Sequence, residues 1–321
     1  MKLPAMKRNE TTVLMVIMVA VALMMILVNP GTFLTQNNLK GMAFQLPELG
    51  ILTFAMMGVM ITGGINLSII ATANMAGISA ALVLKAMESS PVAGLLLAVI
   101  TALAVSGGIG LINGTLIAYV GITPILATLG TMTLFNGVAI VVTEGYVISG
   151  FSPAVLFIGN GSALGIPFPL LVFALSAIVL TIILKKTRTG FSMYMIGSNA
   201  TATRFSGIHN ETVLLKTYLI SGLFSGIAAL VMISRFNSAK SGYGNSYLLV
   251  TILAAVLGGV SSDGGFGRVS GVVVSLITLQ LLSSGFNLLR VSSFMTTAIW
   301  GFVMILVMVI NNIIDMREKR G

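Results

Sequence analysis

The segment KKTRTGFSMYMIGSNATATRFSGIHNE, residues 185–211, is the long polar interruption in a chain otherwise built from apolar runs. It contains two lysines, two arginines and the only histidine, His209. Lys and Arg gather on the cytoplasmic side of membrane proteins, where they fix the orientation of the neighbouring helices. The segment is therefore expected to be a cytoplasmic loop between two membrane-spanning helices.

The composition on both sides of this loop is that of an integral membrane protein. The chain has 321 residues, 56% of them hydrophobic and 8% charged, and its mean hydropathy is +1.06, whereas soluble proteins carry about 25% charged residues. The net charge of +9 does not indicate nucleic-acid binding, because the basic residues flank apolar segments and do not alternate with aromatic ones. With no cysteine and one histidine, we expect no disulfide and no metal site.

Ten apolar runs predict an all-α, polytopic integral membrane protein with about ten transmembrane helices in a single domain, residues 1–321. The runs are 11–28, 46–62, 67–84, 92–112, 125–142, 166–184, 217–234, 248–260, 271–288 and 294–313. Several are shorter than the roughly 20 residues that cross a bilayer, so some helices are expected to be short or broken and buried in protein. The first run is longer than a signal-peptide core and lacks a small-residue cleavage pattern, which favours a span.

Ten spans that start from a cytoplasmic amino terminus distribute the basic residues unevenly. Twelve of the 17 Lys and Arg residues fall on the cytoplasmic side and five on the outer side. This asymmetry predicts that both termini and residues 185–211 are cytoplasmic. The cytoplasmic set is Lys2, Lys7, Arg8, Lys185, Lys186, Arg188, Arg204, Lys216, Arg268, Arg317, Lys319 and Arg320.

The predicted spans carry no ionisable residue away from their ends, with Glu48, Lys85 and Glu144 placed at the edges. Pumps and ion-coupled carriers usually keep such residues inside the membrane, so the pattern favours a neutral polar solute and lowers, without removing, the case for secondary transport. The candidates for a solute pathway are mostly polar residues at span centres: Asn66, Ser68, Asn74, Asn113, Thr131, Phe135 and Asn136. For any single one of them, hydrogen bonding between helices is the favoured interpretation.

Two glycine-rich turns, residues 63–66 and 258–265, follow apolar runs, but neither is a nucleotide-binding loop. The Walker pattern, in which Gly is followed after four residues by Gly-Lys-Ser or Gly-Lys-Thr, does not occur. An intramembrane enzyme would have only Ser or Thr nucleophiles without an evident base. We therefore expect that the chain is not an enzyme, that it has no catalytic residue and binds no cofactor, and that any ATP is used by another chain.

Four stretches resemble the permease subunits of ABC importers of the ribose-type monosaccharide family. They are GGINLS (63–68), NGTLIAYVGITPILATLGTM (113–132), TGFSMYMIGSNATATRFSGI (189–208) and ILAAVLGGVSSDGGFG (252–267), and they occur in the family's order. The resemblance covers most of the chain and implies a multi-pass protein of the bacterial cytoplasmic (inner) membrane. It would form the translocation pathway of an ATP-driven importer for a neutral monosaccharide such as ribose.

The same resemblance implies the partners. They are an ABC ATPase on the cytoplasmic side, a solute-binding protein on the outer side, a second permease subunit that is identical or different, and membrane lipid, with no nucleic acid. A nucleoside or a furanose-like signalling molecule is an alternative substrate. An ion-coupled secondary transporter of a small neutral solute is the competing class of protein.

By this resemblance residues 185–211 carry a coupling helix that docks in a groove of the ATPase. The residues that match the family pattern there are Gly197, Asn199, Ala200, Gly207 and Ile208, and Phe205 is a further candidate for contact with the ATPase. Small residues permit close docking, Asn can cap a helix start, and the two apolar side chains offer anchors; the alternative is an ordered loop that packs on its own subunit. The sequence departs from the family at Asn66, Leu248 and Val250, where the family has acidic residues, which indicates a divergent branch.

Overall fold

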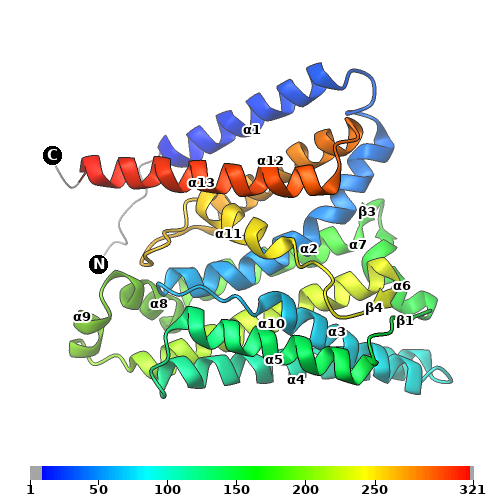
Figure 1. Ribbon diagram of the computed structural model, residues 1–321, viewed down its shortest axis with the longest axis horizontal. Helices are drawn as coiled ribbons and strands as arrows, with labels where there is room; N and C mark the ends of the chain where they lie inside the picture. The colour runs from blue at the N-terminus through cyan, green and yellow to red at the C-terminus, as the bar shows by residue number, and fades with distance from the viewer. Residues whose placement is uncertain (1–8, 319–321) are drawn as a thin grey trace.

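The computed structural model describes residues 9–318, which fold into a bundle of long helices (Figure 1). The long helices match the predicted spans one for one, which confirms an all-α polytopic fold; Lys2, Lys7, Arg8, Lys319 and Arg320 lie outside the described residues. The helices that match the spans are α1 (Asn9–Val28), α2 (Gln36–Ile61), α3 (Ile69–Ala86), α4 (Pro91–Ala118), α5 (Pro124–Thr143), α7 (Phe168–Lys186), α10 (Asn210–Phe236), α11 (Tyr247–Leu257), α12 (Val269–Leu288) and α13 (Ser293–Glu318).

Short elements connect these helices. Three are helices, α6 (Pro153–Asn160), α8 (Arg188–Ser198) and α9 (Ala200–Phe205). The strands β1 (Ile148–Ser149) and β4 (Ser238–Ala239) form one antiparallel pair, and β2 (Ser162–Ala163) and β3 (Ile166–Pro167) form another. Each strand has two residues, so the strands only join loops.

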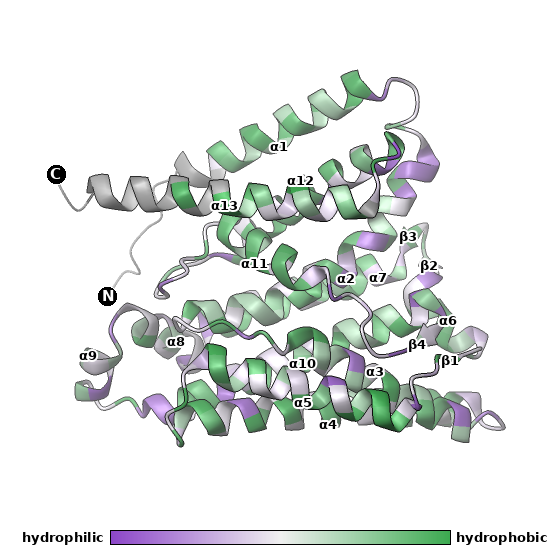
Figure 2. Cartoon of the chain, in the orientation of Figure 1, coloured by the Kyte–Doolittle hydropathy of each residue, from purple (hydrophilic) through white to green (hydrophobic). Residues whose placement is uncertain are grey.

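In the described part of the chain, seven helices are long and apolar enough to cross a membrane: α2, α3, α4, α5, α7, α10 and α12. Three others contribute shorter apolar stretches, Thr12–Val28, Tyr247–Leu257 and Phe294–Ile305. Hydrophobic residues cover the lengths of the helices, while hydrophilic residues concentrate toward the two ends of the bundle (Figure 2). This distribution is the one that a bilayer imposes on a helical protein.

The two ends of the bundle carry different elements (Figure 1). At one end, here called the α9 end, lie α8 and α9, the start of α1 and the finish of α13. At the opposite end, here called the α6 end, lie α6 and the β1–β4 pair. The segment between α5 and α7 is ordered at the α6 end, because Ser234 of α10 accepts a hydrogen bond from the Gly159 amide at its hydroxyl (2.5 Å) and one from the Asn160 side chain at its carbonyl (2.9 Å).

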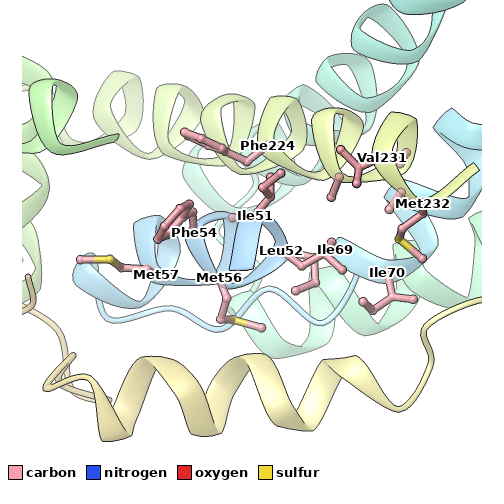
Figure 3. Packing of buried hydrophobic residues seen from close by; sticks show 14 of the residues in the cluster. Ile51, Leu52, Phe54, Met56, Met57, Ile69, Ile70, Phe224, Val231 and Met232 are labelled. Atoms are coloured by element: carbon pink, nitrogen blue, oxygen red, sulfur yellow. The ribbon is translucent and has the colours of Figure 1, made fainter. Parts of the chain in front are cut away.

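Helix α2 forms the centre of the core, because its second half is buried on all sides. A helix that is apolar all round is stable only inside protein or membrane. The Phe54 ring stacks on Phe173 of α7 with centroids 5.2 Å apart and meets the edge of Phe224 of α10 at 6.4 Å. Figure 3 shows α2 between α10, which carries Phe224 and Val231, and α11.

Two helices begin inside the bundle. After α2 ends, residues 62–68 return the chain toward the middle of the bundle, where α3 starts (Figure 1). Helix α11 has 11 residues, so it rises only about 16 Å, roughly half of the ~30 Å hydrocarbon core. Residues 258–268 then lead from α11 into α12. The expectation of short and broken helices is confirmed at these two places.

Candidate functional site

The break between α2 and α3 is held by the side chain of Asn66. Its Oδ1 accepts hydrogen bonds from the backbone amide (3.0 Å) and the hydroxyl (2.8 Å) of Ser68, which fixes the turn that leads into α3. Such local bonds from Asn side chains replace missing helix bonds in turns. On the other side of the break, the hydroxyl of Thr128 in α5 accepts a hydrogen bond from the Leu67 amide at 3.1 Å.

Four of the predicted pathway residues meet at this break and bond to one another. The Asn113 amide donates to the Ser68 hydroxyl at 2.8 Å, and the Thr131 hydroxyl donates to Asn113 Oδ1 at 2.6 Å. The Asn66 amide donates to the hydroxyl of Ser221 in α10 at 3.0 Å. Each member is at most 4% exposed. This chain of bonds ties α3, α4, α5 and α10 together, so in this conformation these residues hold helices in register and face no open channel.

The other three predicted pathway residues lie apart from this network. Asn74 is buried, and its amide donates to the Tyr243 carbonyl at 3.1 Å. Phe135 and Asn136 are half-buried on α5, and within the described structure Asn136 Oδ1 is buried without a hydrogen-bond partner. An unpaired buried carbonyl oxygen is costly to keep, so Asn136 is the predicted pathway residue with unused hydrogen-bonding capacity.

The face of α5 that points away from the rest of the bundle, here called its outward face, is an open groove with small residues along it. Its lining includes Leu126, Thr133 and Val141, together with Gly130 and Gly137. No atom lies within 4 Å of the position that a Cβ would take at either glycine. The face is therefore smooth and unfilled, which is the surface that close helix approach in a membrane requires.

The predicted coupling residues divide between an exposed helix and a buried junction. Asn199 caps α9, because its Oδ1 accepts from the Ala202 amide at 2.8 Å. Ala200 is exposed, and Phe205 is 89% exposed at the tip of the α9 end. Gly207 ends α9 with φ of +80°, a conformation that other residues rarely adopt. The side chain of Ile208 is partly buried and packs against the core of the bundle, so it is not displayed with Phe205.

Gly197 lies at a contact between three backbones, here called the glycine junction and defined by Gly63, Gly197 and Gly264. A Cβ on Gly197 would sit 2.0 Å from the Ile61 carbonyl oxygen, and one on Gly264 would sit 2.6 Å from the Gly63 nitrogen. The Gly265 amide donates to the Ile61 carbonyl at 2.9 Å. Only glycine allows backbones to approach this closely. The junction joins the end of α8 to the α2–α3 break and to the loop between α11 and α12.

A tyrosine adds a second tie between α8 and the same loop. The Tyr194 hydroxyl donates to the Gly267 carbonyl at 2.7 Å. Burial raises the pKa of Tyr194 to about 12, although the positive charge of Arg268 opposes the rise. The hydroxyl therefore keeps its proton, and the hydrogen bond, at any physiological pH. Helix α8 is thus attached to the loop by a side chain as well as by the backbones of the glycine junction.

A buried ion pair corrects the expectation that the spans have no internal charge. Glu48 is 0% exposed and lies well inside α2, where it accepts hydrogen bonds from Arg235 of α10 and, at 3.2 Å, from the Tyr247 hydroxyl of α11. The sequence pattern placed Glu48 at an edge because the preceding residues are polar. Helix α2 in fact begins at Gln36, where the Thr35 side chain caps it. Extending the helical periodicity backward from residue 46 would have placed the start of the helix earlier, and Glu48 inside it.

In the described residues, no three His, Cys, Asp or Glu side chains lie close enough to hold a metal ion. Ser221 and Thr128, which complete the network at the α2–α3 break, were not predicted. Ser and Thr are ordinary in apolar spans, and their partners lie far away in the sequence, 155 residues from Asn66 for Ser221. No local signal marks such a pair.

Comparison with known proteins adds chain-wide similarity to these geometric observations. Residues 38–310 match the family model described as a branched-chain amino acid transport system permease component. The chain is 35% identical to the ribose import permease protein of Bacillus subtilis over 89% of this chain and 87% of that protein. It is 34% identical to the ribose import permease protein of Escherichia coli K12, over 87% of each chain.

A second group of similar proteins carries a different name. The autoinducer 2 import system permease protein of Photorhabdus laumondii is 33% identical over 81% of this chain and 79% of its own length. No solved structure matches the chain significantly. The similarity therefore rests on sequence, and it extends over both the α2–α3 break and residues 185–211.

Proposed function

Because the chain belongs to the family of permease subunits of sugar ABC importers, we propose that it forms the translocation pathway for a neutral monosaccharide such as ribose and couples to a separate ATPase. The observation that carries the substrate class is the similarity to ribose permeases along nearly 90% of the chain. The family is one of transport permeases and not of enzymes. In this assignment ATP is hydrolysed by the partner ATPase, and the chain itself binds no cofactor.

The α9 end is the proposed docking surface for the ATPase. Phe205 projects from a short helix whose start is capped by Asn199 and tied to α10 by a hydrogen bond from the Asn210 side chain to the Ala200 carbonyl (2.8 Å). A large exposed apolar side chain on a small, fixed element is the anchor that a groove in a partner receives. The α9 end then lies in the cytoplasm and the α6 end faces the solute-binding protein.

The glycine junction is the proposed route by which α8 and α9 act on the membrane core. A displacement of α8 by the ATPase would press on the α2–α3 break and on the 258–268 loop together, since the three backbones are in contact. Packed backbones transmit a shift because there is no flexible side chain between them to absorb it. The pathway would then open where a second permease subunit meets the outward face of α5, beside Asn136.

A copurification experiment tests the coupling surface. The chain is expressed in its native bacterium with an affinity tag and solubilised in mild detergent, and the proteins that copurify are identified. An ATPase is expected with the native chain and lost with Phe205→Ala, because the anchor is removed while the fold is not. Leu164→Ala is the matched control, since Leu164 is 103% exposed at the α6 end. Retention of the ATPase by Phe205→Ala, or its absence from the native sample, contradicts the coupling proposal.

The similarity to autoinducer 2 permeases supports one alternative substrate, a furanose-like signalling molecule. Uptake of radiolabelled ribose by cells that carry the complete system distinguishes the two, with unlabelled autoinducer 2 as competitor. Uptake that depends on ATP and resists the competitor supports the sugar. Uptake that collapses with the ion gradient and survives loss of the ATPase would instead indicate a secondary transporter.

A further inference from the structure

A pocket of about 250 Å³ lies between α2, α11, α12 and α13, away from the α2–α3 break. Ligand sites in proteins typically measure ~300–1,000 Å³, so this pocket suits a molecule smaller than most drugs. Its lining includes Gln45, Tyr247, Gln280, Ser283, Asn287 and Trp300. None of the residues that line it is charged.

The pocket reaches into the membrane-spanning part of the bundle. Gln45 lies nine residues after the start of α2, and Gln280 lies eight residues before the end of α12. At 1.5 Å per residue, these positions are roughly 12–14 Å inside the ends of their helices at the α6 end. Helix α11 begins at Tyr247, in the lining of this pocket, and runs toward the α9 end (Figure 1).

Polar atoms around the pocket lack protein partners. The Gln280 amide donates to Gln45 Oε1 at 3.2 Å, which uses one polar atom of each side chain. Among the described residues, the remaining atoms, Gln45 Nε2 and Gln280 Oε1, have no hydrogen-bond partner, and neither do the side chains of Ser283, Asn287 and Trp300. At the depth of Gln45 and Gln280, polar groups without partners cost free energy unless a ligand or water satisfies them, whereas Asn287 is exposed and lies next to the end of α12. Donors and acceptors both face the same small space.

Two aromatic side chains give the pocket an apolar surface. Trp300 is 8% exposed, and its ring is held by Phe286 with centroids 6.1 Å apart. Tyr247 is fixed by its hydrogen bond to Glu48, whose charge is compensated by Arg235. The negative face of an aromatic ring attracts the polarised C–H groups of a sugar, while amides and hydroxyls bond its hydroxyl groups. A lining without charge selects against ions.

We propose that this pocket binds a small neutral polyhydroxylated solute, of the monosaccharide class, on its way through the outer half of the membrane. The inference rests on the proposed function, because only an importer of such solutes would present them at this depth. It assigns substrate contact to Gln280, Asn287 and Trp300, none of which belongs to the polar network at the α2–α3 break.

Tryptophan fluorescence tests the inference directly, because Trp300 is the only tryptophan in the chain. The permease, with its ATPase bound, is placed in lipid nanodiscs and titrated with D-ribose, D-xylose and D-galactose, and with sodium gluconate as a charged polyol. The same complex with Trp300→Phe gives the emission of the other chains, which is subtracted. At least one neutral sugar is expected to change the emission saturably, while gluconate does not. Gln280→Leu is expected to weaken that response at least tenfold.

Two further variants separate loss of the site from loss of the fold. Asn287→Ala removes an exposed side chain and is expected to weaken binding at least threefold without changing thermal stability. Thr181→Val, in α7, where the hydroxyl bonds only to the Ala177 carbonyl of its own helix, is expected to leave the response unchanged. An undiminished response in Gln280→Leu and Asn287→Ala overturns the inference, and so does an equal response to the lipid or detergent alone.

Transport by the same complex, reconstituted in proteoliposomes and supplied with its solute-binding protein, distinguishes the two proposals. If the complex imports a neutral sugar in proteoliposomes but Trp300 shows no saturable response, the pocket inference fails and the proposed function stands. If the complex imports none of the neutral sugars under ATP, the proposed function fails as well. Import that is reduced in Gln280→Leu and normal in Thr181→Val supports both.

Discussion

At the scale of single residues, Gly197 is the position with the least tolerance for change. A Cβ there would overlap the Ile61 carbonyl and lie 2.2 Å from the Gly265 nitrogen. Both atoms belong to the backbone, so neither can rotate away. The residue was predicted as part of a docking surface because it lies in the polar loop and is small. The structure instead places it on the inner side of α8, where its lack of a side chain permits the glycine junction.

Gly197→Ala is expected to destabilise the protein by about 3 kcal/mol, the upper part of the usual cost of overpacking, and to uncouple ATP hydrolysis from transport. Thermal unfolding in detergent and the ratio of sugar imported to ATP hydrolysed measure the two effects. Gly108→Ala in α4 is the matched control, because nothing lies within 4 Å of its Cβ position. A Gly197→Ala variant as stable as the native chain would show that the three backbones are not in contact.

The polar pathway residues show what sequence can and cannot give at this scale. Their positions at span centres were predicted, and Asn66, Ser68, Asn113 and Thr131 do meet. Their mutual bonding was not predictable, since the partners of Asn113 lie 45 and 18 residues away on other helices. Periodicity reports which face of a helix is polar, but it does not report which polar groups satisfy one another. Asn136 differs from the four because it is only half-buried and lies apart from their network, with an unpaired side-chain oxygen that the sequence does not reveal.

At the scale of elements, the ten apolar runs predicted the ten long helices because burial in lipid demands continuous apolar stretches. Helix ends were predicted less well. Helix α2 starts ten residues before its apolar run, because residues 36–45 already form helix although none of them is buried. Within this stretch Asn38 Oδ1 accepts a hydrogen bond from the Ser284 hydroxyl at 2.8 Å. Helices α8 and α9 were expected only as one coupling loop. Their separation at Asn199 depends on a cap that serves as the end of one helix and the start of the next.

The ion pair between Glu48 and Arg235 joins α2 to α10, and its two members should respond unequally to mutation. The Glu48 side chain is 0% exposed and that of Arg235 is 20% exposed. Arg235→Met leaves a carboxylate sealed in the core and is expected to cost ~3–5 kcal/mol. Glu48→Gln leaves a cation that still reaches solvent and is expected to cost less.

The double variant Glu48→Gln with Arg235→Met should recover most of the loss, because it removes both charges. Thermal unfolding of the native chain, the two single variants and the double variant, all in the same detergent, measures these losses of stability. Equal losses from the two single variants, or no recovery in the double variant, would mean that the pair is not buried as the structure has it.

At the scale of the whole molecule, the distribution of basic residues predicts which end of the bundle meets the cytoplasm. Lys185, Lys186, Arg188 and Arg204 all lie on or beside the elements of the α9 end, while Lys85 and Arg235 lie toward the α6 end. The asymmetry could be read from sequence because orientation is set by charge near helix ends and needs no tertiary structure.

The absence of cysteine makes this orientation directly testable. Ser206→Cys at the α9 end and Ser162→Cys at the α6 end both place a thiol at an exposed position. In intact spheroplasts, a membrane-impermeant maleimide is expected to label Ser162→Cys and to label Ser206→Cys only after the membrane is permeabilised. The native chain is the control for background. Labelling of Ser206→Cys in sealed spheroplasts would invert the proposed topology.

The glycine junction has a consequence for how such a transporter can evolve. Contact between Gly63, Gly197 and Gly264 is made by backbone and carries no side-chain identity. The side chains proposed to select an ATPase, Ala200 and Phe205, lie on α9 and outside that contact. Under the proposed coupling, partner choice and the transmission of movement therefore belong to different residues. Substitutions on α9 could then suit a new ATPase without disturbing the contact between the three glycines.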